Sequence, residues 1–347
     1  MYYFTTYFDR NYLSRGLILY ESIKEYCDQF ELYILCLDNF TKQYFESNAS
    51  QFKEIKIISL EEIEQYDVDL KKCKQNRNTI EYYFTLSPCL PLYLLKIYLI
   101  PHICSLDADI LILNKVNSLF DYLNKYSIVV TPHKYSKEVK SKEEIYGVFN
   151  VSFQIFKNDS IGISCLEKWR EQCIDWCGDY EDEKNNRYAD QKYLDEWPKL
   201  YNEVLKILDD NISGLASWNL NNYQISNIGN RFYSNNERII FYHFDAFKFF
   251  NSRLSTNGFV DLKIRKQKAI HRLYIFYWRK LVIYNQILSL EHDQSTRRKS
   301  SNNILIRALF ETSLYFRISN RSIIIVNYKW VPTIIKTVLI KLIKCLN

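Results

Sequence analysis

The chain has 347 residues, of which 47% are hydrophobic and 25% charged, so it can build a sizeable core and has the composition of a globular protein. Only seven glycines stand beside 29 tyrosines and 21 phenylalanines, and neither GxGxxG nor GxxxxGK[ST] occurs. This composition disfavours Walker-type NTPases, standard dinucleotide-binding folds and wholesale disorder.

The net charge of +6 is unevenly distributed along the chain. Residues 262–347 contain 17 lysines and arginines against three acidic residues, whereas the first 261 residues hold more acids than bases. We therefore expect a catalytic or binding domain over 1–261 and a basic, aromatic-rich helical tail over 262–347 that meets an anionic surface.

The nine cysteines are scattered and form no CxxC pair, which is typical of free, buried thiols in a reducing compartment. The N-terminus lacks the basic and apolar regions of a signal peptide, and no run of 18 apolar residues is free of charge. These features predict a cytoplasmic protein.

Short apolar strands alternate with helix-length segments over the first 160 residues. Strands are expected at 2–6, 32–37, 55–60, 103–106, 127–131 and 151–156, with helices at 13–27, 81–99 (interrupted at Pro88 and Pro91) and about 160–177. A further helical stretch should run to about 198, and short strands and loops fill 204–244. This alternation predicts an α/β fold with a mostly parallel sheet and a ligand site at the carboxyl ends of its strands.

The strongest chemical signal is the pair Asp107 and Asp109, directly after a buried strand. If the extended conformation continues, residues two apart point the same way, and their like charges repel unless a cation joins them. Oxygen ligands of this kind suit Mg²⁺ or Mn²⁺. The pair favours a divalent-cation site for a diphosphate, with a chance Asp-x-Asp turn as the alternative.

Four segments together resemble bacterial GT-A-fold glycosyltransferases, which use nucleotide-diphospho-sugars and are related in layout to glycosyltransferase family 8. They are residues 5–13 (TTYFDRNYL), 81–88 (EYYFTLSP), 106–109 (LDAD) and 188–194 (YADQKYL). The resemblance covers about residues 1–250 and implies a Rossmann-like sheet flanked by helices.

The resemblance also implies roles for the donor's nucleotide end. Thr5, Thr6 and Tyr7, at the end of the first strand, would hold the base and ribose. Asp107 and Asp109 would bind the ribose and the metal-diphosphate.

At the donor's sugar end, the resemblance implies a second set of contacts. Asp190 and Gln191 would lie at the reacting centre, with Asp190 nearest the anomeric carbon. The residues that would reach the phosphates or the sugar are Asn76, Arg77, Asn78 and Asn150.

A closing segment would complete the site with Ser217, Trp218, Asn219 and His243, and His243 is the candidate third metal ligand. The chain departs from the family here. No glycine follows His243 where a backbone amide would meet the diphosphate, and Ser217 stands where a proline is expected. The closing loop should therefore have its own geometry.

Four of these residues also have a plain structural interpretation. Asp190 could cap a helix that runs to about 198, and His243 could be a satisfied core residue at the end of an apolar strand. Trp218 could fill the core instead of stacking on a sugar, and Arg77 could lie on a solvated face.

The sequence thus predicts a metal-dependent glycosyltransferase, with Mn²⁺ or Mg²⁺, that moves a sugar to a glycan or lipid-linked acceptor in bacterial surface polysaccharide synthesis. The Asp-x-Asp pair with a late histidine leans towards retention of configuration. The alternatives are a sugar-phosphate nucleotidyltransferase and a non-enzymatic protein that binds a membrane surface or an anionic polymer.

The tail favours a membrane partner over nucleic acid. From Pro332 onward the apolar residues fall on one half of a helical wheel and three lysines on the other, and residues 273–284 are dense in aromatic and basic residues. We expect peripheral attachment to an anionic membrane at the cytoplasmic face. A helix packed on the domain is the alternative.

Overall fold

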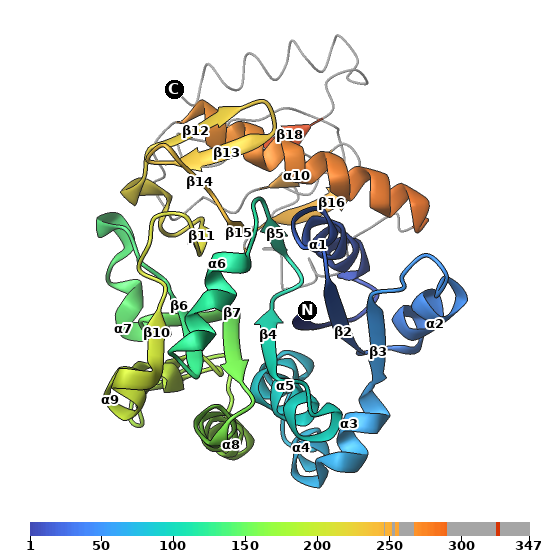
Figure 1. The fold of residues 1–347 in the computed structure, drawn as a ribbon, viewed down its shortest axis with the longest axis vertical. Helices are drawn as coiled ribbons and strands as arrows, with labels where there is room; N and C mark the ends of the chain where they lie inside the picture. The colour runs from blue at the N-terminus through green and yellow to red at the C-terminus, as the bar shows by residue number, and fades with distance from the viewer. Residues whose placement is uncertain (246, 252–253, 257–266, 290–323, 327–347) are drawn as a thin grey trace, which may run out of the picture.

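A seven-stranded sheet forms the centre of the computed structural model, which describes residues 1–245, 247–251, 254–256, 267–289 and 324–326 (Figure 1). In sheet order the strands are β10 (Leu205–Ile207), β6 (Ile128–Pro132), β7 (Phe149–Lys157), β4 (His102–Leu106), β1 (Tyr2–Phe8), β2 (Phe30–Cys36) and β3 (Ile55–Ser59). β7 runs antiparallel to both of its neighbours, and every other pair is parallel. The mostly parallel sheet predicted from the sequence is confirmed.

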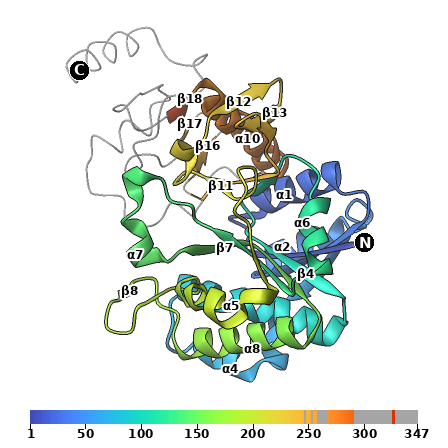
Figure 2. The same cartoon turned by 60° about the vertical axis from the view of Figure 1, so that its left-hand side comes forward.

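Helices cover both faces of this sheet because its central strands are apolar on both sides. On one face, α5 (Thr79–Tyr93) and α8 (Ser160–Asp175) pack over Ile103, Val130 and Phe156. On the other face, α1 (Leu13–Tyr26) packs over Phe4 and Leu32. Figure 2 shows α5 and α8 below the sheet and α1 above it. The loops at the carboxyl ends of the strands stay open to a ligand.

Shorter helices connect and cap these layers. They are α2 (Asn39–Ser47), α3 (Leu60–Tyr66), α4 (Val68–Cys73), α6 (Asn117–Phe120), α7 (Lys142–Tyr146) and α9 (Trp197–Tyr201). Short 3₁₀ turns lie at Asp121–Asn124, Lys137–Val139, Lys192–Glu196, Asn202–Val204 and Leu220–Asn222. Side-chain oxygens of Asp38, Ser59 and Asp159 accept backbone N–H groups at the starts of α2, α3 and α8.

The helix expected at 81–99 differs from its prediction. α5 starts at Thr79 and passes through Pro88 and Pro91 without a break. A π-helical turn, Leu94–Tyr98, follows and ends at Leu99, whose φ is +54°. Each proline removes one amide donor from the helix. The near-complete burial of residues 85–95 maintains the helix, since packing outweighs local propensity.

Four small sheets accompany the central sheet within the described residues. β5 (Ile110–Ile112), β15 (Phe241–His243) and β11 (Leu215–Ala216) form one of them, with β15 in the middle. The others are β12 (Ile225–Ile228) with β13 (Arg231–Ser234) and β14 (Glu237–Arg238), β16 (Lys248–Asn251) with β17 (Leu254–Thr256) and β18 (Ile324–Val326), and the hairpin β8 (Glu181–Asp182) with β9 (Arg187–Tyr188). The β5–β15 pair holds Asp109 and His243 next to each other in space.

Helix α10 (Lys268–Ile287) lies against α1 in both views (Figures 1 and 2). Its buried face includes Leu273, Tyr274, Tyr277 and Leu281. These side chains belong to the part of the tail, residues 273–284, that we assigned to a membrane interface. They face protein instead, so for this segment the alternative of a helix packed on the domain holds. The segment after Pro332 lies outside the described residues.

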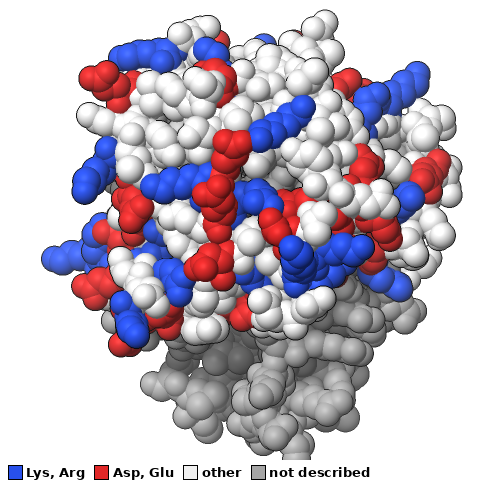
Figure 3. All heavy atoms as spheres, turned by 90° about the horizontal axis from the view of Figure 1, so that it is seen from below, with Lys and Arg blue, Asp and Glu red and all other residues white. Residues whose placement is uncertain are grey.

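Two surface features bear on the expectations. Within the described residues, no helix is both long and apolar enough to cross a bilayer. The face that carries α3, α4, α5, α8 and α9 intersperses basic and acidic side chains (Figure 3). That face offers no single-sign patch for an anionic polymer.

The eight described cysteines are free and buried, as predicted.

Candidate active site

A cavity of about 380 Å³ opens where the carboxyl ends of the central strands meet the β11–β15–β5 sheet. Its walls come from the ends of β1, β4, β6 and β15, from the start of β7, from helices α5 and α7, and from the loops after β9 and β11. The residues that line it are Tyr7, Phe84, Asp107, His133, Tyr135, Lys142, Tyr146, Asn150, Val151, Ser152, Tyr188, Ala189, Asp190, Gln191, Ser217, Trp218, His243 and Asp245. The site lies where an α/β sheet of this kind is expected to bind ligands.

Asp107 and His243 line one side of this cavity, and Asp109, which is not one of the lining residues, lies next to His243. His243 Nε2 lies 3.1 Å from Asp109 Oδ1 and 3.5 Å from Asp107 Oδ2. One ligand atom from each of the three lies within 4.8 Å of the others. The two aspartates converge through a turn, in which Ile110 N donates to Asp107 O at 3.2 Å, and not along an extended strand as expected.

The electrostatics of this group are those of crowded charges. Burial and the nearby Asp109 raise the pKa of Asp107 to about 6, although His243 acts in the opposite direction. Burial also opposes ionisation of Asp109, but His243 outweighs it and lowers the pKa of that carboxyl. Burial disfavours the imidazolium, yet the two aspartates raise the pKa of His243 to about 9. The histidine proton thus partly balances two negative charges in a confined space.

These three residues fit a divalent cation. They supply carboxylate oxygens and one imidazole nitrogen, a donor set that suits Mn²⁺ and also Mg²⁺. His243 is fixed by β15, whose register sets it opposite Ile110, and its ring meets the Trp218 ring edge-on at 5.5 Å. The core-only interpretation of His243 therefore does not describe its position, because Nε2 faces both carboxylates.

Asp190 lies on the cavity wall and is only 1% exposed. Its backbone carbonyl accepts Trp169 Nε1–H at 2.8 Å, which ties the segment to α8. Burial, with a smaller effect from Asp107, raises the pKa of Asp190 to about 7. The 3₁₀ turn that follows has Gln191 at its N-cap position and no side-chain cap. The helix-cap interpretation of Asp190 is therefore wrong.

Three more of the expected residues reach the cavity. Tyr7 comes from β1, and its hydroxyl lies 3.0 Å from Ser87 Oγ. Asn150 accepts from Ser152 through Oδ1, while its buried Nδ2 has no hydrogen-bond partner among the described residues. Gln191 Nε2 donates to Tyr146 O at 2.6 Å. Gln191 thus holds a neighbouring segment as well as lining the wall.

Thr5 and Thr6 do not line the cavity. Thr5 Oγ1 donates to Tyr33 O at 3.1 Å, and both side chains are almost fully buried. The reason is the length of β1, which continues to Phe8, two residues beyond the predicted end at 6. The carboxyl end of the strand, and with it the cavity, begins at Tyr7.

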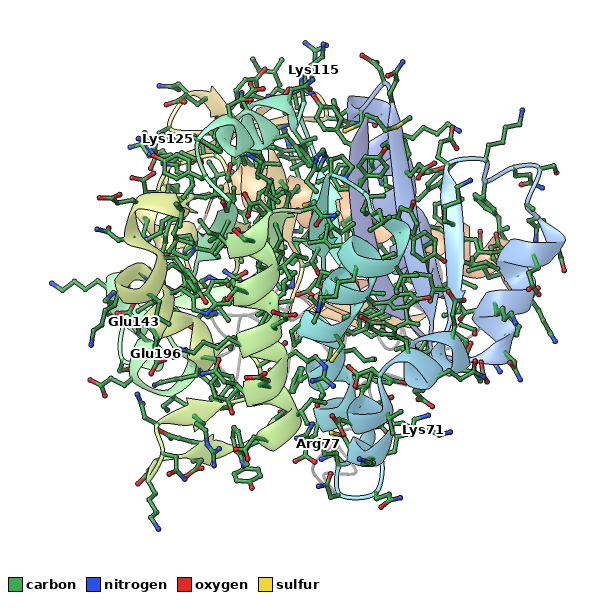
Figure 4. All side chains as sticks on the ribbon, turned by 60° about the horizontal axis from the view of Figure 1, so that its bottom comes forward. Lys71, Arg77, Lys115, Lys125, Glu143 and Glu196 are labelled. Carbon is green, nitrogen blue, oxygen red and sulfur yellow. The ribbon has the colours of Figure 1, made fainter. Side chains whose placement is uncertain are left out.

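Arg77 and Asn78 are also absent from the cavity wall. Arg77 donates to Thr85 Oγ1 and to the carbonyl of Ile174, and Figure 4 shows its side chain beside the end of α8. Asn78 caps α5 in a reciprocal capping box with Glu81. Neither interpretation considered from the sequence, a phosphate contact or a solvated face, describes Arg77, because its guanidinium ties two helices together.

The closing segment divides into residues that face the cavity and one that does not. Trp218 lines the wall, and its Nε1 donates to His133 O at 2.8 Å. Asn219 is fully buried and bonds only to backbone groups of its own loop and of His133. Ser217 Oγ donates to Asp245 Oδ1 at 2.8 Å, a link that the expected proline could not make.

Comparison with known proteins gives distant likenesses. No family model matches the chain. Two relatives from Bacillus subtilis (strain 168) are 28% and 23% identical over 249 and 253 residues, which is 71% of this chain and 78% and 81% of the relatives. They are called "Uncharacterized protein YfnD" and "Uncharacterized protein YfnF".

Among solved structures, the chain resembles glycosyltransferases. Mouse xyloside xylosyltransferase 1 matches with a TM-score of 0.42 and 13% identity, over 62% of this chain and 87% of that one. The galactosyltransferase LgtC, in complex with donor and acceptor sugar analogs, matches with a TM-score of 0.43 and 13% identity, over 70% of this chain and 86% of that one. The glycosyltransferase GlyE of Streptococcus pneumoniae TIGR4 matches with a TM-score of 0.46 and 11% identity, over 85% of this chain and 66% of that one. Likeness at this level does not assign an activity, which must come from the site.

The sequence analysis missed several residues of the cavity wall. Stacked rings of His133 and Tyr135 (4.5 Å between centroids) adjoin Trp218, and Tyr146 meets Tyr188 edge-on at 4.7 Å. Asp245, two residues after His243, also lines the cavity and had no expected role. The local sequence of residues 133–146 does not indicate that they line a cavity. They reach it because they connect β6 to the antiparallel strand β7.

Proposed function

We propose that the chain is a metal-dependent glycosyltransferase that moves a sugar from a nucleotide-diphosphate donor to a hydroxyl of a glycan or lipid-linked acceptor in bacterial surface polysaccharide synthesis. The observation that carries this proposal is the convergence of Asp107, Asp109 and His243 on a cavity at the carboxyl ends of a mostly parallel sheet. The GT-A-like sequence motifs supply the class of donor.

Asp107, Asp109 and His243 would hold the cation, and Mn²⁺ suits their mixed oxygen and nitrogen donors best. Bound there, the cation would neutralise negative charge on the leaving diphosphate. Without it, two carboxylates would face a diphosphate and repel it.

The chain's own groups would position the sugar. Asn150 Nδ2 is a buried donor and Asp190 Oδ2 a buried acceptor, both without partners among the described residues, and both residues line the cavity. Buried polar atoms of this kind gain most when a ligand's hydroxyl pairs with them. The rings of Trp218 and Tyr135 would exclude water from the same space.

We also propose that the basic tail attaches to an anionic membrane. Helix α10 packs on the domain and does not support this attachment. The attachment rests on the sequence from Pro332 onward, where Lys336, Lys341 and Lys344 share one side of a helical wheel. Co-sedimentation with anionic liposomes should decrease when these three lysines become glutamine. Equal sedimentation of both proteins would remove the membrane partner.

The test of the enzymatic proposal is a thermal-shift panel with and without Mn²⁺. It contains nucleoside diphosphates, their sugars, and nucleoside triphosphates with sugar phosphates. The wild type should gain several degrees in Tm with one nucleotide only when Mn²⁺ is present. Asp107→Asn and Asp109→Asn should lose this shift, whereas Asp121→Asn, an exposed control in the 3₁₀ turn after α6, should keep it. A shift with nucleoside triphosphate and sugar phosphate instead would favour a nucleotidyltransferase. A nucleotide shift that survives exhaustive chelation would contradict metal dependence.

A further inference from the structure

We propose that Lys142 binds an anionic oxygen group of a substrate, a phosphate or a carboxylate, in the cavity. The identity of that substrate as a donor or acceptor sugar rests on the proposed function, but the binding of an anion does not. Nothing in the sequence pattern assigned a role to this lysine.

Lys142 is the only lysine or arginine among the described residues that line the cavity. It is half-buried and forms no ion pair within the described part of the chain, although Asp107, Asp190 and Asp245 line the same space. Its ammonium lies 5.7 Å from the centre of the Tyr146 ring. By contrast, Lys140 on the same segment is paired with Glu143 at 2.6 Å. Within the described residues, the ammonium of Lys142 therefore contacts an aromatic ring and has no carboxylate partner.

The segment that carries Lys142 is anchored from the loop that contains Asp190. Gln191 Nε2 donates to the carbonyl of Tyr146 at 2.6 Å, and Lys192 Nζ donates to the carbonyl of Glu144. Asp195 Oδ1 accepts the N–H of Val148 at 2.7 Å, beside Gly147 with its φ of +88°. These contacts hold α7 as part of the wall. Because the segment is already held in place, binding of an anion by Lys142 does not carry the entropic cost of ordering a loop.

The place of α7 in the topology indicates which part of a substrate it would meet. α7 connects β6 to β7, and in the sheet order these strands lie on the opposite side of β4 from β1. Tyr7 at the end of β1 marks the nucleotide side of the cavity under the proposed function. Tyr146 and Tyr188 next to Lys142 offer two aromatic rings, which suit the apolar face of a sugar. An anionic sugar or a phosphate at the acceptor end fits this position, and the donor's diphosphate is the other source of the same chemistry.

The experiment measures dissociation constants of Lys142→Met, Lys142→Arg and wild type by calorimetry at low salt. The probes are uridine diphosphate with Mn²⁺, inorganic pyrophosphate, glucuronate and glucose 6-phosphate, with glucose as the neutral match for the two anionic sugars. Lys142→Met should weaken at least one anionic probe by about tenfold and leave glucose unchanged, and Lys142→Arg should restore most of the loss. Lys140→Met removes one charge from the same segment off the cavity wall and should bind every probe as the wild type does.

The pattern of loss identifies the source of the anion. A loss confined to glucuronate and glucose 6-phosphate supports the acceptor end, and a loss for the diphosphate and pyrophosphate supports the donor. The proposal is wrong if Lys142→Met matches the wild type on all anionic probes, or if the wild type binds none of them. A wild type that binds pyrophosphate through Lys142 but no nucleotide would overturn the proposed function alone.

Discussion

The carboxyl group of Asp190 is buried in a way that costs the folded state stability. It is 1% exposed, and its Oδ2 has no hydrogen-bond partner among the described residues. Burial raises the pKa of Asp190 from 3.8 to about 7. Between these two values the folded protein binds a proton that the unfolded chain has released, so this group makes the folded state less stable as pH rises from about 4 to about 7.

We therefore expect opposite effects of Asp190→Asn on stability and on turnover. The variant should be as stable as the wild type or more stable at pH 8, and it should lose less stability between pH 4 and 7. Turnover should fall by roughly 10²-fold or more if the carboxylate acts at the reacting centre. Chemical denaturation across pH and single-turnover assays measure the two effects. A less stable variant with unchanged turnover per folded molecule would show that Asp190 is structural.

Asn78 should contribute to the stability of the fold and not to nucleotide affinity. Its side chain accepts from the backbone of Ile80 and Glu81 at the start of α5. Replacement by alanine should lower the free energy of unfolding by about 1 kcal/mol and leave nucleotide affinity unchanged. Gln75→Ala, exposed and three residues earlier, is the matched control. Weaker nucleotide binding by Asn78→Ala at unchanged stability would restore the role implied by the resemblance.

At the scale of elements, α7 depends on one backbone position. Gly147 ends the helix with a φ of +88°, and a Cβ there would lie 2.9 Å from Asp195 Oδ1. Gly147→Ala should therefore lower the free energy of unfolding by about 1–3 kcal/mol and loosen α7. Hydrogen exchange at residues 142–148 should rise more than at α8. Unchanged exchange in α7 would show that Asp195 moves aside and that the segment is not held by this contact.

Elements and site differ in how much of them the sequence predicts. Strands with apolar residues on both faces, such as β2 and β4, were predicted within a few residues because burial dictates their composition. The length of β1 was not, since Tyr7 and Phe8 satisfy a strand or a loop equally well, and this error misplaced Thr5 and Thr6. Asp109 and His243 are separated by 133 residues of intervening chain. Local spacing could not predict their contact, and only the resemblance suggested it.

For the whole molecule, α10 packs against residues next to the candidate metal ligands. The Tyr277 ring stacks on Phe244 with 3.8 Å between centroids, and Phe244 follows His243. Phe244 N also donates to Asp109 O at 3.0 Å. Packing of α10 therefore supports the backbone that positions two of the three candidate ligands.

Tyr277→Ala should lower the free energy of unfolding by about 3–5 kcal/mol, because it removes a fully buried ring. It should also weaken Mn²⁺ binding, because Phe244, on which the ring stacks, follows His243 and bonds to the backbone of Asp109. Tyr277→Phe, which keeps the ring, is the control for both. Manganese affinity equal to the wild type's in folded Tyr277→Ala would show that α10 supports stability alone.

The contact between α1 and α10 also has a consequence during synthesis. α1 ends at Tyr26, whereas its partner helix begins at Lys268. At a translation rate of about 5–20 residues per second, the ribosome needs roughly 12–50 s to make the chain between them. Throughout that interval the apolar surface of α1 that α10 will cover is exposed to solvent on an unfinished protein. The nascent chain should therefore be a client of ribosome-associated chaperones until residue 287 has left the exit tunnel.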